Sequence, residues 1–271
     1  MMPRTIHSWL ACPGHARKAA TGSLLLALVA LASLPASTAR AQSDPAAVAL
    51  ADQVLTAVGG REAWEQTRYF AFDFVASRRD TVVSRRSLAW DKADGRLRLE
   101  LKDARGRSYA VWTDLAHRDG TVLVDGAPAD SATKRQWLDR AHAIWVNDTY
   151  WLLMPFKLRD PGVTLKAGGA DSTGKGSILE LSFAGVGLTP GDRYRVHVDD
   201  ATHLVTGWEM MLEGNQDGRW KPAQWTDWKG VGDVKLAERR HIPDDQVVIT
   251  FENLTTARSA PPGAFDPPSG R

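Results

Sequence analysis

In the first part of the chain after residue 42, apolar side chains recur every three or four positions, which places them on one face of a helix. Ser43 or Asp44 can begin this helix by accepting a free backbone N–H. Pro45 suits the first turn because proline has no N–H to leave unsatisfied there, and Gly59 and Gly60 favour the end of the helix. The predicted apolar face consists of Val48, Ala51, Leu55 and Val58.

From Arg68 onwards the spacing changes to two, because Phe70, Phe72 and Phe74 alternate with other residues. The same alternation recurs in four further segments. Pairs such as Asp-Gly lie between or after these segments, and they favour hairpins because glycine accepts positive φ. Such short turns predict an antiparallel meander. The further strands of this group are expected at Ser84–Trp90, Arg96–Leu101, Ser108–Thr113 and Thr121–Val124.

A second helical spacing follows, and Asp130 or Ser131 can cap its start. Its apolar face consists of Trp137, Leu138, Ala141, Ile144 and Trp145. The apolar run Trp151–Met154 comes next, and Pro155 is expected to stop it. A second group of strands is expected at Ser177–Phe183, Arg193–Asp199, Leu204–Leu212, Ala223–Trp228, Val234–Arg240 and Val247–Leu254.

Ten or eleven strands in one unbroken domain need curvature or closure to protect their edges and to bury one face. We therefore predict a mainly β fold with α (α+β). It is a single curved antiparallel sheet or half-barrel, with helices covering the concave face. This domain is expected to occupy residues 42–258, followed by a proline-rich C-terminal tail at residues 259–271.

The first 41 residues predict a secretory signal peptide. They combine an early basic region, the short apolar run Ser23–Leu34 and the small-residue pattern Ala39–Arg40–Ala41. The apolar run is shorter than the roughly 20 residues of a membrane-spanning helix. We therefore expect a bacterial protein that is periplasmic or secreted, without a stable membrane anchor once the leader is cleaved.

Removal of the leader changes the charge and the chemistry of the chain. The leader contains four of the 34 basic residues and none of the 32 acidic ones. The remaining chain therefore has 30 basic and 32 acidic side chains, and the net charge falls from +2 to about −2. This balance predicts no nucleic-acid partner. The Arg78–Arg79 and Arg85–Arg86 pairs are interpreted as solvated strand faces or a turn. Cys12 also leaves with the leader, which excludes disulfides and thiolate sites in the mature chain.

The order of elements resembles the periplasmic lipoprotein-localisation factors LolA and LolB. The helix ending in Val58-Gly59-Gly60, with Trp64 after it and the aromatic strand Tyr69–Phe74 next, looks like the opening of that superfamily. The segment from Asn147 to Val163 (NDTYWLLMPFKLRDPGV) is similar more specifically to a family of secreted bacterial proteins without assigned function. The resemblance implies a half-barrel with covering helices.

The carriers of this superfamily hold acyl chains in an apolar cavity, so the resemblance implies a ligand site on the inward face. The implied residues of the sheet are Phe70, Phe72, Phe74, Leu88, Trp90, Leu97, Leu99, Trp112, Trp208 and Met210. Asp148, Tyr150 and Trp151 of the insert complete the set. The alternative is that these residues pack against the helices and leave no room for a ligand.

The insert also contains the best candidate for a polar site. Asp148, Lys157, Arg159 and Asp160 can form a charged cluster at the mouth of the cavity, or they can serve as helix caps and a turn. Among the histidines, His197 and His203 flank Asp199 and Asp200, a combination able to bind zinc if a hairpin brings them together. We expect no metal and no cofactor.

No established catalytic motif is present, so no catalytic residue is assigned. The sequence favours a non-catalytic carrier whose partner is a hydrophobic small molecule or lipid, with an envelope protein as a further candidate partner. Two alternatives stay open. One is a hydrolase of an envelope component that uses Asp148 and a histidine, and the other is a structural or partner-binding module whose sheet is filled by its own side chains.

Overall fold

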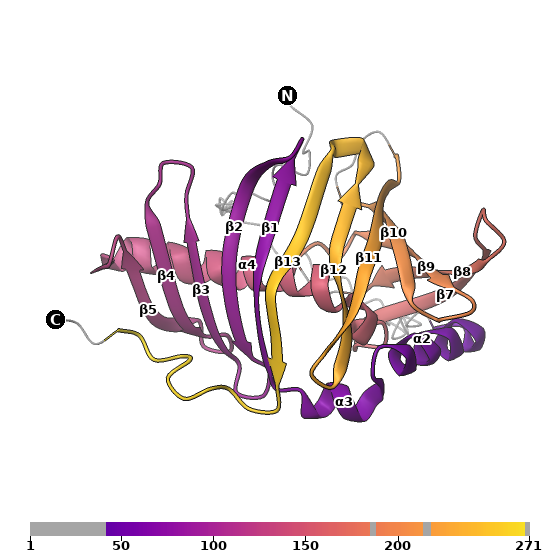
Figure 1. The fold of residues 1–271 in the computed structure, drawn as a ribbon, viewed down its shortest axis with the longest axis horizontal. Helices are drawn as coiled ribbons and strands as arrows, with labels where there is room; N and C mark the ends of the chain where they lie inside the picture. Colours follow the sequence, from indigo (N-terminus) through magenta and orange to yellow (C-terminus); the bar gives the residue numbers. More distant parts are fainter. Residues whose placement is uncertain (1–41, 185–187, 214–217, 269–271) are drawn as a thin grey trace, which may run out of the picture.

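The computed structural model describes residues 42–184, 188–213 and 218–268; the predicted leader and the last three residues of the tail lie outside this part. One antiparallel sheet has the strand order β6-β5-β4-β3-β2-β1-β13-β12-β11-β10-β9-β8-β7. Figure 1 shows a curved sheet with the long helix α4 lying across one face, behind the strands. The elements are α2 (Pro45–Ala57), α3 (Gly60–Gln66), β1 (Tyr69–Arg78), β2 (Thr81–Asp91), β3 (Arg96–Lys102), β4 (Ser108–Asp114), β5 (Asp119–Val124), β6 (Ala127–Pro128), α4 (Ser131–Lys157), β7 (Val163–Ala170), β8 (Gly176–Phe183), β9 (Arg193–Asp199), β10 (Val205–Met211), β11 (Lys221–Val231), β12 (Val234–Ile242), η1 (Pro243–Asp245) and β13 (Val247–Ala257).

The sheet consists of two meanders that meet in its middle. Strands β1 to β6 form the first arm and β7 to β13 the second, and the arms join where β1 pairs with β13, with Phe74 opposite Phe251. The sheet is not closed into a barrel, because β6 and β7 lie at opposite edges. The predicted fold class and the half-barrel arrangement implied by the resemblance are confirmed.

The position of α4 follows from this topology. The chain leaves the first arm at one edge, at β6, and enters the second arm at the other edge, at β7. Its connection must therefore cross the whole sheet. A helix of 27 residues extends about 40 Å at 1.5 Å per residue, which suits such a crossing. Asp130 caps its start by accepting from the backbone N–H groups of Ala132 and Thr133, as predicted.

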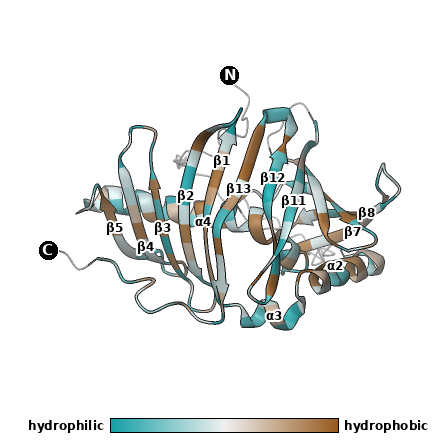
Figure 2. Cartoon of the chain, viewed as in Figure 1, coloured by the Kyte–Doolittle hydropathy of each residue, from teal (hydrophilic) through white to brown (hydrophobic). Residues whose placement is uncertain are grey.

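Alternation along the strands separates the two faces of the sheet. Bands of apolar and polar colour follow one another along strands such as β12 and β13 in Figure 2. On β2, Leu88 and Trp90 are buried beneath α4, while Arg85 on the opposite face is exposed. The concave face therefore holds the apolar core, as a period of two requires when one face of a sheet is buried.

The structure differs from the sequence analysis at two places in and after the insert. Helix α4 is continuous through Pro155 and ends at Lys157, whereas the sequence predicted a stop at the proline. The second difference is β7, an edge strand that the sequence did not predict. Its second half contains Gly168 and Gly169, which weaken the alternation on which the other strands were recognised.

The N-terminal helix α2 packs beside β7. Its buried residues are Ala47, Ala51 and Val54, and Val58 directly after it is buried too, so the apolar face is turned slightly from the prediction. Ser43 and Asp44 precede the helix but do not cap it with their side chains. Their oxygens instead accept the backbone N–H groups of Leu165 and Ala167 on β7, at 3.0 and 3.1 Å. The predicted capping residues thus attach the helix to the edge of the sheet.

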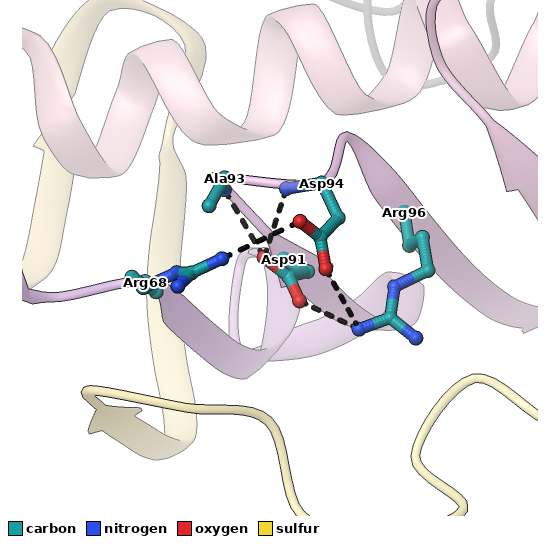
Figure 3. Close-up of polar contacts among 5 residues, drawn as sticks. All are labelled: Arg68, Asp91, Ala93, Asp94 and Arg96. Atoms are coloured by element: carbon teal, nitrogen blue, oxygen red, sulfur yellow. Dashed lines mark hydrogen bonds and ion pairs between the residues drawn. The ribbon is translucent and has the colours of Figure 1, made fainter.

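The C-terminal tail returns to the face opposite α4. The ring of Phe265 lies 6.1 Å from the ring of Tyr69, and the guanidinium of Arg96 lies 4.8 Å from the Phe265 ring. Arg96 is itself held by the carboxylates of Asp91, at 2.8 Å, and Asp94, at 3.3 Å (Figure 3). This network fixes the turn between β2 and β3 against which the tail lies.

Asp91 is the buried centre of that turn. Its carboxylate accepts the backbone N–H groups of Ala93 and Asp94 in addition to the bond from Arg96 (Figure 3). Burial alone would raise the pKa of Asp91, but the hydrogen bonds from Arg96 and from the two backbone groups outweigh it and lower the pKa below its usual range.

Candidate functional site

A row of six side chains crosses the concave face from one arm to the other. Each comes from a different strand, and neighbouring members are in contact. The successive separations are 4.5, 5.5, 5.2, 3.4 and 5.1 Å, measured between ring centroids or from a guanidinium carbon to a ring centroid. We call this set the transverse row; it consists of Arg86 (β2), Phe74 (β1), Phe251 (β13), Arg240 (β12), Trp225 (β11) and Trp208 (β10).

One segment of α4 covers the transverse row. Residues 147–151 bring Asp148 onto Arg86, at 2.9 Å, and Asn147 donates to the same carboxylate oxygen of Asp148, at 2.8 Å. The side chain of Arg86 is 3% exposed and that of Asp148 0%. Burial raises the pKa of Asp148, while Arg86 and Asn147 act in the opposite direction. The second carboxylate oxygen, Oδ2, is buried and has no hydrogen-bond partner among the described residues.

Arg240 is fully buried and is bonded to carbonyl groups. Its Nε and Nη2 donate to the carbonyl oxygen of Trp151, at 3.1 and 2.7 Å, and Nη1 donates to Ala237 and Arg239 on its own strand. In a regular helix the Trp151 carbonyl would accept the N–H of residue 155, which proline lacks. Arg240 therefore supplies the donor that Pro155 removes, which accounts for a helix that continues past a proline.

Arg86 is paired with a carboxylate, but Arg240 is not. Among the described residues no carboxylate lies within 4 Å of the Arg240 guanidinium, and its nearest aromatic face is that of Trp225. Burial lowers the pKa of Arg240 well below its usual range. Carbonyl dipoles and ring faces hold the cation in place of a counter-ion.

Aromatic side chains extend the row at both ends. On the first arm, the Trp90 ring lies 5.6 Å from Phe70 and 5.5 Å from Trp145 of α4. On the second arm, Tyr150 and Trp151 of α4 lie 5.8 and 4.7 Å from Trp208. The other residues expected on the inward face also lie in the core beneath α4: Phe72, Leu88, Leu97, Leu99 and Met210.

Several polar atoms in this aromatic core are unsatisfied. The indole N–H groups of Trp90, Trp145, Trp208 and Trp225 are buried and have no acceptor among the described residues. A buried donor without a partner destabilises a protein by about 1–3 kcal/mol, and native interiors contain few of them. The interface between α4 and the sheet thus contains several hydrogen-bond donors for which the described residues provide no acceptor.

Trp112 is not part of this face, and the expectation that it points inward was wrong. Its neighbours Val111 and Thr113 face α4, so the alternation turns Trp112 to the opposite side, where it is paired with Arg98. There it lines a groove of about 830 Å³, together with the exposed Val83 and with Asp266 of the tail. The charged residues of the groove balance, three basic against three acidic: Arg85, Arg98, Lys102, Glu100, Asp103 and Asp266.

The charged cluster expected at the cavity mouth does not form as a unit. Asp148 lies in the interior with Arg86, whereas Lys157 pairs with Asp160 at 2.9 Å, and Arg159 pairs with Asp52 of α2 at 2.7 Å. The latter two pairs fix the C-terminal end of α4.

The histidines do not converge either. His197 lies 3.8 Å from Glu209, and Asp199 accepts from Thr202 within its turn. Among the described residues no group of three or more potential ligands could hold a metal ion. For the hydrolase alternative, the Asp148 carboxylate accepts hydrogen bonds from Arg86 and Asn147, and neither is an imidazole.

Sequence reasoning missed four members of the row: Arg86, Phe251, Arg240 and Trp225. The interpretation of Arg86 as part of a solvated face was wrong, although Arg79 does lie in the β1–β2 turn, with φ of 47°. The alternation itself contained the signal, because Arg86 lies two and four positions before Leu88 and Trp90, on their face of β2.

No family model matches this chain, and no curated protein matches it. Among solved structures, a DUF1329 family protein from Desulfovibrio piger is 16% identical, with a TM-score of 0.45, over 83% of this chain and 98% of that one. A LolA superfamily protein from Nitrosomonas europaea is 10% identical, with a TM-score of 0.45, over 82% and 97%. The Mycobacterium tuberculosis lipoprotein LppX is 12% identical, with a TM-score of 0.31, over 79% and 97%. A function has to be argued from the site itself.

Proposed function

We propose that the protein is a non-catalytic carrier of the bacterial envelope that binds a hydrophobic or amphiphilic molecule between α4 and the sheet. The observation that carries this proposal is the aromatic surface beneath α4, whose buried indole N–H groups lack acceptors. An amphiphile supplies both an apolar chain for the rings and oxygen atoms for the donors. The predicted leader supports a location in the periplasm or outside the cell. Within the described residues, no helix has the length and apolar character needed to cross a bilayer.

Binding requires that α4 move away from the transverse row. The strand ladder is complete without the helix, so this movement breaks side-chain contacts and leaves the sheet intact. The contacts to be broken are the Arg86–Asp148 pair, the bonds from Arg240 to Trp151, and the aromatic contacts of Tyr150 and Trp151. An acyl chain gains roughly 0.8 kcal/mol per buried methylene, or about 8 kcal/mol for ten methylenes before the cost of association.

The first experiment is mass spectrometry of lipids extracted from the purified mature protein, combined with a titration by fatty acids of increasing length. Trp9 is lost with the leader, so the remaining tryptophans report on the folded domain. We expect a change in tryptophan fluorescence and an affinity that rises about fourfold per methylene. If no lipid is extracted and no fatty acid changes the fluorescence, the carrier proposal is wrong.

Two variants locate the binding surface. Trp151→Leu removes a half-buried ring from the concave site but keeps the backbone carbonyl that Arg240 binds, and it should weaken fatty-acid binding several-fold. Val83→Glu is the matched control, because Val83 lies half exposed in the groove on the opposite face. Loss of binding in Val83→Glu with normal binding in Trp151→Leu would move the site to that groove.

Hydrogen exchange separates a carrier from a module filled by its own side chains. A covering helix that opens should exchange its amides faster than the central strands β1 and β13, and ligand should slow that exchange. If the amides of residues 147–154 are protected as strongly as those of β1, with or without fatty acid, the filled-module alternative is correct.

A further inference from the structure

The two arginines buried beneath α4 differ in their partners. Arg86 and Asp148 form one neutral pair, and Arg240 adds a second buried cation three strands away along the row. Among the described residues, Arg240 contacts carbonyl oxygens and ring faces. The buried carboxylate of Asp192, on the same arm, accepts from Thr189, Tyr194 and the backbone N–H of Glu213. Arg240 is therefore a buried cation that no carboxylate contacts among the described residues, and it lies at the second-arm end of the row.

Two of the four unsatisfied indole donors beneath α4 lie beside this cation. Trp225 packs its ring against the guanidinium of Arg240, and Trp208 lies 5.1 Å from Trp225 on the neighbouring strand. Both indole N–H groups are buried without an acceptor in the described part of the chain. A cation and two unsatisfied donors thus lie side by side at this end of the row. At the other end, Arg86 is already paired with Asp148.

We propose that the second-arm end of the row, formed by Arg240, Trp225 and Trp208, binds the anionic head group of an amphiphile, with the apolar chain lying on the remainder of the aromatic surface. This inference rests on the proposed carrier function and names the class of its ligand. When α4 withdraws, the Trp151 carbonyl leaves Arg240, and the two guanidinium nitrogens that donated to it become available to a carboxylate or phosphate. A charge-assisted bond to a planar guanidinium is stronger than a bond to a neutral carbonyl.

The test compares dodecyl amphiphiles that share one chain and differ in the head group. Dodecanoate, dodecyl phosphate, dodecyl maltoside and dodecyltrimethylammonium are titrated into the mature protein at pH 8, below their critical micelle concentrations. We expect the two anions to bind at least tenfold more tightly than the maltoside, and the cation to bind most weakly. Comparison of dodecanoate with dodecyl phosphate distinguishes a carboxylate from a phosphate head group.

The outcomes separate this inference from the carrier function. If all four amphiphiles bind equally, or the cation binds most tightly, the head-group assignment is wrong and the carrier function stands. If none of them binds, the carrier function itself fails. Tight binding of the anions alone supports both.

Variants then test the residues. Arg240→Gln should reduce the preference for anions to about twofold while keeping the affinity for dodecyl maltoside. Arg239→Gln is the matched control, because Arg239 is the exposed neighbour on the same strand, and it should behave like the wild type. Trp225→Phe keeps a ring against Arg240 but removes one donor, and should weaken anion binding about threefold; this variant decides the question if Arg240→Gln does not fold. Full anion preference in both Arg240→Gln and Trp225→Phe would overturn the assignment.

Discussion

The two buried arginines of the transverse row are both held in the protein interior, but by different kinds of partner. Both contact the short segment of α4 at residues 147–151, but Arg86 meets a carboxylate and Arg240 meets a backbone carbonyl. The first contact is a neutral pair that is complete in itself, and the second holds a net positive charge by dipoles and ring faces. The comparison suggests that the Arg86 end anchors the helix, while the Arg240 end can exchange its partner for another acceptor.

The largest effect is expected from breaking the pair. Arg86→Met leaves Asp148 buried without its cation and should destabilise the protein by about 3–5 kcal/mol, measured by urea unfolding at pH 8. The double variant Arg86→Met/Asp148→Leu should recover most of this loss, because it removes both charges. A double variant as unstable as Arg86→Met would show that the destabilisation arises from packing rather than from the stranded carboxylate.

The penalty of Arg86→Met should depend on pH. Burial raises the pKa of Asp148, so the folded protein favours its neutral form, and this contribution to stability is greatest below the unfolded pKa and declines as pH rises through the folded pKa. Without Arg86, which acts to lower that pKa, the decline becomes larger. The difference in unfolding free energy between wild type and variant should therefore be smaller at pH 4 than at pH 8, and a difference that grows towards acid would contradict the assignment.

A smaller effect is expected at the other arginine. Arg240→Met leaves the Trp151 carbonyl unsatisfied but strands no opposite charge, so it should destabilise by about 1–3 kcal/mol. Arg239→Met, on the exposed position next to it, should change stability by less than about 0.5 kcal/mol. If Arg240→Met is as damaging as Arg86→Met, the distinction between the two ends does not hold.

The link between Arg240 and the proline gives a smaller, more specific effect. Pro155→Ala restores the N–H that the Trp151 carbonyl would otherwise accept, so it should stabilise the Arg240→Met variant by about 1 kcal/mol more than it stabilises the wild type. A double-mutant cycle of unfolding free energies measures this coupling. A coupling of zero would mean that Arg240 does not substitute for the missing helix bond.

The smallest effect on stability is expected at Asp91, outside the row. Its pKa is shifted in the opposite direction to that of Asp148, so it serves as a control for the pH dependence. Hydrogen bonds lower the pKa of Asp91, so its contribution to stability is present above the unfolded pKa and is lost as pH falls through the folded pKa. Asp91→Asn weakens the pairing with the half-exposed Arg96 and should cost about 0.5–1 kcal/mol at pH 7. The cost should shrink as the pH falls below the ordinary aspartate pKa of about 3.9 and through the lowered pKa of folded Asp91, as measured by the same unfolding experiment.

The parts of the fold that depend on local spacing could be predicted. The faces of β1 and β2 follow from a period of two, and the cap at Asp130 follows from residue type. Trp112 was misplaced because it was chosen as an aromatic residue, although the alternation in its strand turns it to the other face.

The centre of the site could not be predicted in the same way. Arg86 lies 62 residues from Asp148, and Arg240 lies 89 residues from Trp151, so neither contact leaves a local pattern. A charged residue in a strand is usually exposed, and only the partner supplied by another element makes burial tolerable. The helix through Pro155 was missed for the same reason, since the donor that permits it comes from β12.

The crossing of α4 from one edge strand to the other limits how the helix can move. Only residues 129 and 130 separate it from β6, and residues 158–162 separate it from β7. The helix is thus tethered at both ends, like a strap across a bowl, and cannot swing outward on a single hinge. A ligand of the proposed carrier would therefore enter from the side beneath α4, and such a route favours slender, flexible chains over bulky ring systems.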